Sequence, residues 1–430
     1  MSAAIEMGEG GASKPAPAAQ ASEDSKPKFA ADEKSLMEQT KDCLTGSKVN
    51  VLYVFVIFAV IFGFGKWSDS MTFLTSFLAL IPLAAALGDL TEDIAKRTND
   101  ATAALINVTF GNATELIISL VALKYGQYDI IKFSLIGSII GNMLLVLGTA
   151  FMLAGLKNPS LTFNAPATNS YLSTLILSCL CFLAPTAFST IDAAAANPIY
   201  SLRLSREVSI LMVVVYAAYL YFQQKTHRHL FDEQPACAVE SPKKAATATD
   251  SDERPEGSAA VPAPAAEEEE DDDEEPEYSM FFAIAATAVV ALIISLLSDF
   301  LVDSIEGAAE GLHLSKHFIG LVLVPIVGNV AEHASAIMMA LKMKLDIAIG
   351  VALGSSVQIG MFVMPVICIA GIPFDRDLDL RFSVFTTTTL FVTVLLTFAV
   401  SNAGSATWLS GLKLIVAYMI LCLAFFHAPD

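Results

Sequence analysis

Cysteine is scarce in this sequence of 430 residues, and its six copies are scattered along the chain. None of them forms a Cys-x-x-Cys pair, which argues against a disulfide framework and against a zinc site. Residues 1–40 lack the apolar core of a secretory signal peptide, so we expect the first hydrophobic run to act as the insertion signal. An excess of basic residues is also missing. The formal net charge is −19, which argues against a nucleic-acid partner.

Hydrophobic residues are abundant and make up 54% of the chain. They gather in runs of about twenty residues, the length at which an α-helix crosses a hydrocarbon core of about 30 Å. We therefore predict an all-α polytopic membrane protein in contact with the lipid bilayer. The expected runs lie at about 49–65, 70–97, 101–124, 129–154, 168–190, 206–224, 279–311, 316–341, 345–370, 382–401 and 405–426.

The negative charge is concentrated between Lys225 and Glu277, where seventeen acids stand against five basic residues. This stretch has too few apolar residues to bury a core, so we predict a disordered linker there. The linker lacks the spacing and the turn glycine of an EF-hand loop, so Ca²⁺ is expected to bind it only weakly. Its continuous acidic run comprises Glu267, Glu268, Glu269, Glu270, Asp271, Asp272, Asp273, Glu274 and Glu275.

Two short segments inside the apolar runs are nearly identical: Gly-Asn-Ala-Thr-Glu at 111–115 and Gly-Asn-Val-Ala-Glu at 328–332. An acid at the centre of a membrane helix costs about 2.5–3.5 kcal/mol, and such acids are functional by default. A chain that accepts this cost twice, in the same local frame, is predicted to use both acids together.

The two segments belong to a longer internal repeat with a shift of 217 positions. Runs two to six and runs seven to eleven make five helices each, and a unit with an odd number of helices reinserts upside down. We therefore predict eleven transmembrane helices, namely one extra N-terminal helix plus two inverted five-helix repeats, as in many secondary transporters. The coinciding pairs are Gly111 with Gly328, Asn112 with Asn329, Glu115 with Glu332, Asp129 with Asp346, Gly137 with Gly354, and Ser138 with Ser355.

The predicted divisions follow from the runs and the repeat. We place the N-terminus in the cytosol, because the long tail and the acidic linker then need no translocation. The bias of basic residues between the two sides is nearly absent, so the charge pattern adds little. The divisions are a disordered cytosolic tail at 1–45, the extra helix at 46–66, the first repeat at 67–224, the acidic cytosolic linker at 225–277, and the second repeat at 278–430.

Within each repeated segment the Asn and the Glu are three residues apart, so they share one face of a helix. If the two helices cross at mid-membrane, two carboxylates and two amide oxygens converge. The glycines let the backbones approach and free nearby carbonyls to act as ligands. An all-oxygen set with two negative charges suits Ca²⁺. The predicted transport site comprises Glu115, Glu332, Asn112, Asn329, Gly111 and Gly328.

The same two acids can carry protons. Two carboxylates close together in a medium of low dielectric cannot both stay ionised without a cation. Metal binding should expel protons and metal release should readmit them. This competition is enough for exchange of Ca²⁺ against protons at one site, without a cofactor.

Further polar residues are weaker candidates. Those on the helices after each segment serve helix packing equally well, and His333 is interpreted as a packing residue, a proton relay or a partner of Glu332. Like-charged pairs at the ends of runs two and seven either line a water-filled access path or are ordinary solvated helix ends. The secondary candidates are Ser138, Asn142, Ser355, Ser356, Gln358 and His333, and the access-path candidates are Asp89, Glu92, Asp93, Asp303, Glu306 and Glu310.

The segments Gly-Asn-Ala-Thr-Glu-Leu at 111–116 and Gly-Asn-Val-Ala-Glu-His at 328–333 resemble the signature repeats of the CAX cation/proton exchangers of the calcium/cation antiporter superfamily. The resemblance extends over about 50–426 and looks most like the fungal vacuolar members. It implies eleven helices, with Glu115 and Glu332 as essential acids, and an acidic helix on the cytosolic side. It also implies export of cytosolic Ca²⁺ into an acidic vacuole, driven by luminal protons.

Three alternatives remain open. A sodium-coupled calcium exchanger of the same fold would be expected to carry extra acids near 136–142 and 353–359, and none is present. A broader divalent exchanger that also takes Mn²⁺ fits the same ligands, and an oligomer is compatible with the sequence. An intramembrane hydrolase built on the Glu-His pair lacks the His-Glu-x-x-His spacing and leaves the repeat unexplained, so we expect no enzyme.

Overall fold

The computed structural model describes most of the chain, and the described elements are almost all helices. The predicted tail up to residue 33 and the acidic run at 267–275 lie outside the described residues. The described residues are 34–98, 102–103, 106, 109–191, 197–231 and 276–428.

In the first half of the chain, the apolar runs form helices that begin at short polar residues. Asn164, for example, accepts a hydrogen bond from the backbone N–H of Ala167 and so starts α8, as expected for an N-cap. The elements are α1 (Leu36–Thr45), η2 (Lys48–Tyr53), α2 (Val54–Gly65), α3 (Asp69–Lys96), α5 (Ala113–Tyr125), α6 (Tyr128–Gly141), η3 (Asn142–Val146), α7 (Leu147–Lys157), β1 (Leu161–Thr162), α8 (Ala165–Phe188), α10 (Pro198–Tyr221), η4 (Phe222–Thr226) and η5 (Arg228–Leu230).

The second half follows the same order of long and broken helices. Ser279 and Ser383 cap α11 and α17 in the same way as Asn164 caps α8. The elements are α11 (Met280–Leu312), α12 (Lys316–Phe318), η6 (Ile319–Leu323), α13 (Val324–Gly328), α14 (Val330–Leu341), α15 (Leu345–Gln358), η7 (Ile359–Val363), α16 (Met364–Ala370), α17 (Val384–Ser401), β2 (Ser405–Ala406) and α18 (Trp408–Phe426).

Within the described residues, nine helices are long and apolar enough to cross a membrane. The segments Lys316–Gly328 and Val330–Leu341, bent by 60°, add a tenth if they count as one span. The chain is therefore a multi-pass membrane protein. Of the expected third run, the structure describes chiefly α5, which starts at the repeated segment, so the count of eleven stays a prediction.

Two long spans form the centre of the molecule. Tyr128–Lys157 and Leu345–Ala370 are the most buried of the candidate spans. Each contains a π-helical turn, η3 in the first and η7 in the second, and the two turns lie 217 positions apart like the repeated segments. Such turns often mark functional sites. Nothing in the sequence pattern predicted these turns.

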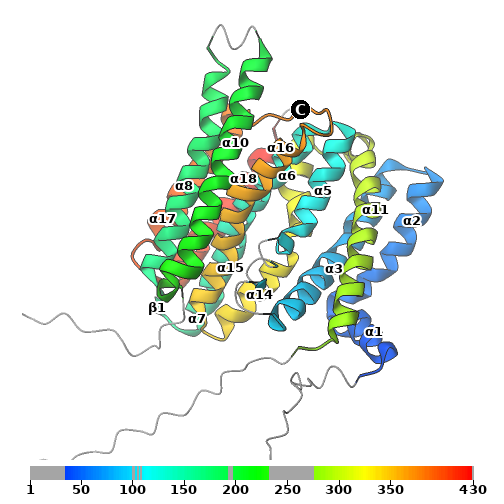
Figure 1. The fold of residues 1–430 in the computed structure, drawn as a ribbon, viewed down its shortest axis with the longest axis horizontal. Coiled ribbons are helices and arrows are strands. Elements are labelled where there is room, and N and C mark those ends of the chain that lie inside the picture. Colours follow the sequence, from blue (N-terminus) through cyan, green and yellow to red (C-terminus); the bar gives the residue numbers. More distant parts are fainter. Residues whose placement is uncertain are drawn as a thin grey trace, which may run out of the picture.

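The other helices pack around this centre in two groups. Figure 1 shows α2, α3 and α11 side by side at one edge, and α8 with α10 at the opposite edge. The phenyl ring of Phe300 on α11 packs against α2, edge-to-face with Phe64 at 5.1 Å. The extra N-terminal helix is thereby attached to the pair α3 and α11.

The molecule has two ends, which we call near and far. The near end carries α1 and the start of α11, where the Gln39 carbonyl accepts the backbone N–H of Ser279 at 2.8 Å. It also carries a two-stranded antiparallel ladder that pairs Leu161 with Ala406, a small addition to the predicted all-α fold. The far end carries the last turn of α18, where Phe425 accepts a hydrogen bond from Ser315.

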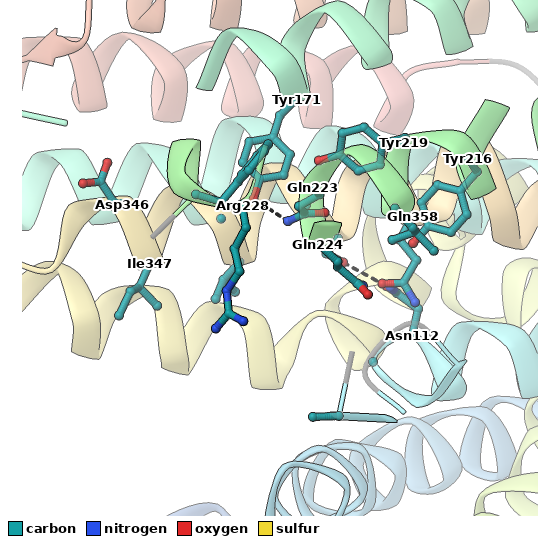
Figure 2. A pocket seen from close by; sticks show the side chains of 18 of the residues that line it. Asn112, Tyr171, Tyr216, Tyr219, Gln223, Gln224, Arg228, Asp346, Ile347 and Gln358 are labelled. Carbon is teal, nitrogen blue, oxygen red and sulfur yellow. Dashed lines mark hydrogen bonds between the residues drawn. The ribbon is translucent and has the colours of Figure 1, made fainter. Parts of the chain in front are cut away.

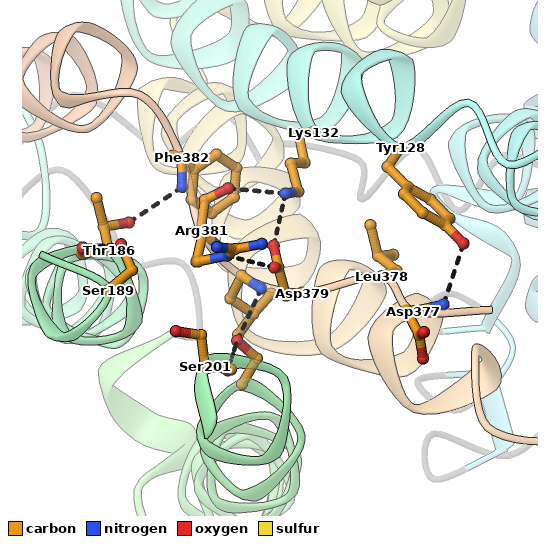
Figure 3. Close-up of polar contacts among 12 residues, drawn as sticks. Tyr128, Lys132, Thr186, Ser189, Ser201, Asp377, Leu378, Asp379, Arg381 and Phe382 are labelled. Atoms are coloured by element: carbon orange, nitrogen blue, oxygen red, sulfur yellow. Dashed lines mark hydrogen bonds and ion pairs between the residues drawn. The ribbon is translucent and has the colours of Figure 1, made fainter. Parts of the chain in front are cut away.

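At the far end, residues 371–383 connect α16 to α17, and we call this connection the far-end strap. Asp379 is buried and forms ion pairs with Lys132 of α6, at 2.7 Å, and with the Arg381 guanidinium (Figure 3). Backbone N–H groups of the strap also donate to hydroxyls on three helices. These are Asp377 to Tyr128, Leu380 to Ser205, and Phe382 to Thr186, at 3.0, 3.0 and 3.1 Å.

Candidate cation-binding site

The site is built where two helices begin inside the protein. Asn329 separates α13 from α14 at the 60° bend, and Asn112 precedes α5. Neither asparagine uses its side chain to cap the helix that follows it. Both amides are therefore available to partners from the other half of the chain.

Two serines join the halves in a symmetric pattern. The Ser138 hydroxyl on α6 lies 3.4 Å from Glu115 Oε1 and donates a short hydrogen bond to Asn329 Oδ1. The Ser355 hydroxyl on α15 lies 3.5 Å from Glu332 Oε1 and 2.9 Å from Asn112 Oδ1. Each serine thus contacts the glutamate of its own half and the asparagine of the other half.

Both glutamates are buried, with 6% and 9% of Glu115 and Glu332 exposed. Each occupies the third position of a helix, α5 or α14, where the positive end of the helix dipole favours a negative charge. The Oε2 atom of Glu332 and the Oδ1 atom of Asn142 have no hydrogen-bond partner among the described residues. Buried acceptors of this kind are normally satisfied, so their chemistry fits a cation.

Gly328 is required for the two halves to approach. A Cβ atom at this position would lie 2.6 Å from the carboxyl carbon of Glu115, well inside van der Waals contact. The absence of a side chain lets the bend at Asn329 pack directly on the Glu115 carboxylate.

One cavity, which we call the vestibule, leads from the near end to this site. It has a volume of about 730 Å³, and Glu332, Asn112, Ser355 and Gly111 contribute to its lining. A second cavity of about 420 Å³ at the far end has neither glutamate in its lining. The described structure therefore exposes the site to the near end.

The vestibule wall contains residues that the sequence pattern did not predict. Tyr171 lies in its centre and accepts a hydrogen bond from Gln223 at 3.4 Å (Figure 2). Tyr216, Tyr219 and Arg228 also line it. They come from α8, α10 and η5, which lack the repeated motif, so the sequence alone contained no signal for them.

The secondary candidates differ in whether they contact the site. Asn142 donates to Ser355 at 3.1 Å and so extends the polar network. Gln358 lines the vestibule. Ser356 instead donates to the backbone carbonyl of Ala352 inside its own helix. His333 contacts the Thr149 hydroxyl of α7 at 3.0 Å.

The six acids considered for an access path do not line the vestibule among the described residues. Asp93 is buried, accepts the backbone N–H of Glu277 at 2.6 Å, and lies 3.9 Å from Arg97. Glu306 lines the far cavity and pairs with Lys316 at 3.0 Å. Glu92 forms an exposed pair with Lys96. Asp89, Asp303 and Glu310 are exposed.

The fold and the site define a multi-pass membrane protein whose two halves each supply a buried acid to one polar centre. Residues 69–225 and 282–427 match the model of the sodium/calcium exchanger protein family. The chain belongs to this family, and its similarity to curated vacuolar exchangers confirms the resemblance to the vacuolar cation/proton exchangers.

Two relatives and one solved structure are especially informative. Vacuolar cation/proton exchanger 3 of Oryza sativa subsp. japonica is 38% identical over 386 residues, which cover 89% of this chain and 87% of the relative. The vacuolar calcium ion transporter of Schizosaccharomyces pombe is 34% identical over 397 residues, 92% and 89% of the two chains. The crystal structure of the Ca²⁺/H⁺ antiporter YfkE matches with a TM-score of 0.69 and 32% identity. The match covers 88% of this chain and 98% of the YfkE chain.

Proposed function

We propose that this protein exchanges cytosolic Ca²⁺ for luminal H⁺ across a vacuolar membrane, and that Glu115 and Glu332 bind the cation or protons in competition. The observation that carries this proposal is the serine-linked centre, in which both acids and both asparagines meet. The names of the relatives, a vacuolar calcium ion transporter and a Ca²⁺/H⁺ antiporter among them, support the same substrates.

The donor set supports a hard divalent cation. The centre offers carboxylate, amide and hydroxyl oxygens, which are the ligands that Ca²⁺ takes. In the described part of the chain, no group of three His, Cys, Asp or Glu gathers as a metal cluster. Amides, hydroxyls and water would therefore complete the coordination. Mn²⁺ is a competitor on these ligands.

Alternating access follows from the symmetric pattern. We propose that the two halves are inverted repeats, because the contacts of Ser138 and Ser355 are exchanged when the halves are exchanged. The vestibule then corresponds to the state open to the cytosol, with α1 and the end of the acidic linker on the same side. The alternate state, with the roles of the two halves exchanged, would expose the site at the far end. There an acidic lumen returns protons to the two glutamates.

Transport by purified protein tests the proposal. In liposomes with an inside-acid pH step, we expect the wild-type protein to take up Ca²⁺. Glu115→Gln or Glu332→Gln should lower this uptake at least a hundredfold, because each change removes one of the two carboxylate charges that would bind the cation. Asp377→Asn, an exposed acid at the far end, is the matched control and should transport normally. Uptake that survives both glutamate changes would refute the proposed site, and uptake driven only by Na⁺ would refute the proton coupling.

A further inference from the structure

The vestibule contains a second carboxylate, for which the proposed function gives no role. Among its described lining residues, the acids are Glu332 and Asp346. Figure 2 shows Asp346 at one end of the lining group and Asn112 with Gln358 at the other, with Tyr171 in between. Asn112 shares the Ser355 hydroxyl with Glu332, whereas Asp346 contacts Asn164, which follows the near-end strand β1. Asp346 thus lies toward the near end of the vestibule and the glutamate toward its inner end.

Asp346 is held in a fixed orientation. It lies in the first turn of α15, where the helix dipole favours an acid. Its Oδ1 atom accepts the backbone N–H of Asn164 at 2.6 Å. One carboxylate oxygen therefore fixes the side chain, and the second oxygen is available to a ligand in the vestibule.

The internal repeat supplies an independent observation. The counterpart of Asp346 is Asp129, 217 positions earlier, in the first turn of α6. Asp129 lines the far cavity. Each acid lies in the first turn of the helix that carries a serine of the site, Ser138 for Asp129 and Ser355 for Asp346. Each also lines the cavity at its own end. A role limited to stabilising the helix would not require both acids to line a cavity.

We propose that Asp346 is an outer binding residue that takes the hydrated divalent cation from the near-end solution before it reaches Glu332, and that Asp129 does the same at the far end. This inference rests on the proposed function. Lys225 and Arg228 also line the vestibule and repel a cation, so a carboxylate at the mouth is needed to offset them. Hydroxyl and amide groups of Tyr171 and Gln223 replace waters along the path.

Asp346→Asn tests the charge alone, because asparagine keeps an Oδ1 atom to accept the Asn164 N–H. In liposomes with Ca²⁺ supplied at the near end, we expect KM for Ca²⁺ to rise about three- to tenfold, with Vmax unchanged at saturating Ca²⁺. The difference should shrink as ionic strength rises from about 0.02 to 0.3 M, because salt screens a partly exposed charge. Asp346→Glu, which keeps the charge, should stay within about twofold of wild type.

Three comparisons make the result specific. Asp42→Asn removes an exposed acid on α1 at the same end and should leave KM unchanged. Asp129→Asn should leave near-end KM unchanged and raise KM for Ca²⁺ supplied at the far end. Lys225→Gln, a change of opposite sign in the same wall, should lower near-end KM about two- to threefold.

An unchanged KM in Asp346→Asn, while wild type transports normally, would overturn the inference and leave the proposed function standing. A loss of Vmax at constant KM would also overturn it, because it would assign Asp346 a structural role. Wild-type protein without proton-driven uptake would instead refute the proposed function itself. If Asp346→Asn yields no folded protein, an unchanged KM in Lys225→Gln counts against the inference.

Discussion

At the scale of single residues, the site depends on groups that are ordinary in type and unusual in position. A serine on a membrane helix commonly donates to a carbonyl of its own helix, as Ser356 does. Ser138 and Ser355 instead contact asparagines of the other half of the chain. Their hydroxyls can reverse as donor and acceptor, so they can follow the glutamates from the protonated to the cation-bound state.

Gly328→Ala is predicted to impair transport strongly without removing the charged groups. The added Cβ would meet the Glu115 carboxyl group at 2.6 Å or less, so the bend and the acid must separate, and the ligands lose their spacing. We expect Ca²⁺ uptake to fall at least tenfold, measured in liposomes at equal protein. Gly350→Ala is the control, because its Cβ would be in ordinary contact with the Tyr171 hydroxyl at 3.6 Å. Normal uptake by Gly328→Ala would show that this contact is dispensable.

At the scale of elements, the far-end strap attaches α6 of the first half to α8 and α10. Its centre is the buried pair of Asp379 and Lys132, with 7% and 13% of their side chains exposed. Burial acts to raise the pKa of Asp379, but the charges and hydrogen bonds of Lys132 and Arg381 outweigh it and hold the pKa below its ordinary value of 3.8. The pair therefore stays charged in an acidic compartment.

Asp379→Asn is predicted to destabilise the protein by about 3 kcal/mol at pH 7, because it leaves a buried lysine without its counter-charge. A carboxyl group whose pKa is lowered in the folded state stabilises the protein at pH values above its ordinary pKa. This stabilisation is lost as the pH falls through the lowered pKa. The variant should therefore be equally destabilised at about pH 7 and pH 5 and approach wild type only below pH 3.8. Thermal unfolding in detergent at a series of pH values measures this.

The matched change in the same strap is Asp377→Asn. The side chain of Asp377 is 81% exposed and lies 3.5 Å from Arg206, and pairs of this kind contribute at most about 1 kcal/mol. If both variants unfold at the same temperature, the buried pair does not hold the strap.

At the scale of the whole molecule, the N-terminal helices are attached to the span that begins the second half. Gln39 is 2% exposed, and its carbonyl accepts the N–H and the hydroxyl of Ser279 at the start of α11. The end of the linker is attached nearby, where Asp93 accepts the N–H of Glu277. The segment that follows the predicted acidic linker thus meets α1, α3 and α11 at one place.

Removal of residues 1–46 is predicted to lower stability, because the partly buried start of α11 loses both hydrogen bonds to Gln39, at a cost of about 1–3 kcal/mol. Removal of residues 1–33 keeps Gln39 and should leave the unfolding temperature unchanged. Gln39→Ala in the full chain should reproduce most of the effect of the longer deletion. Equal unfolding temperatures for the two deletions would show that α1 contributes no stability through this contact.

By itself, the sequence determined the membrane class, most of the helices, the repeat and the residues of the polar centre. These could be predicted because a span has a required length in apolar residues, and because an acid in such a run is costly enough to stand out. Only the tertiary structure decided which residues from distant parts of the chain are in contact. It showed that Ser138 and Ser355 exchange partners between halves, that Tyr171 and Asp346 line the vestibule, and that Asp93 is a buried anchor. Those contacts join residues far apart in the chain, and helix periodicity fixes only neighbours three or four positions away.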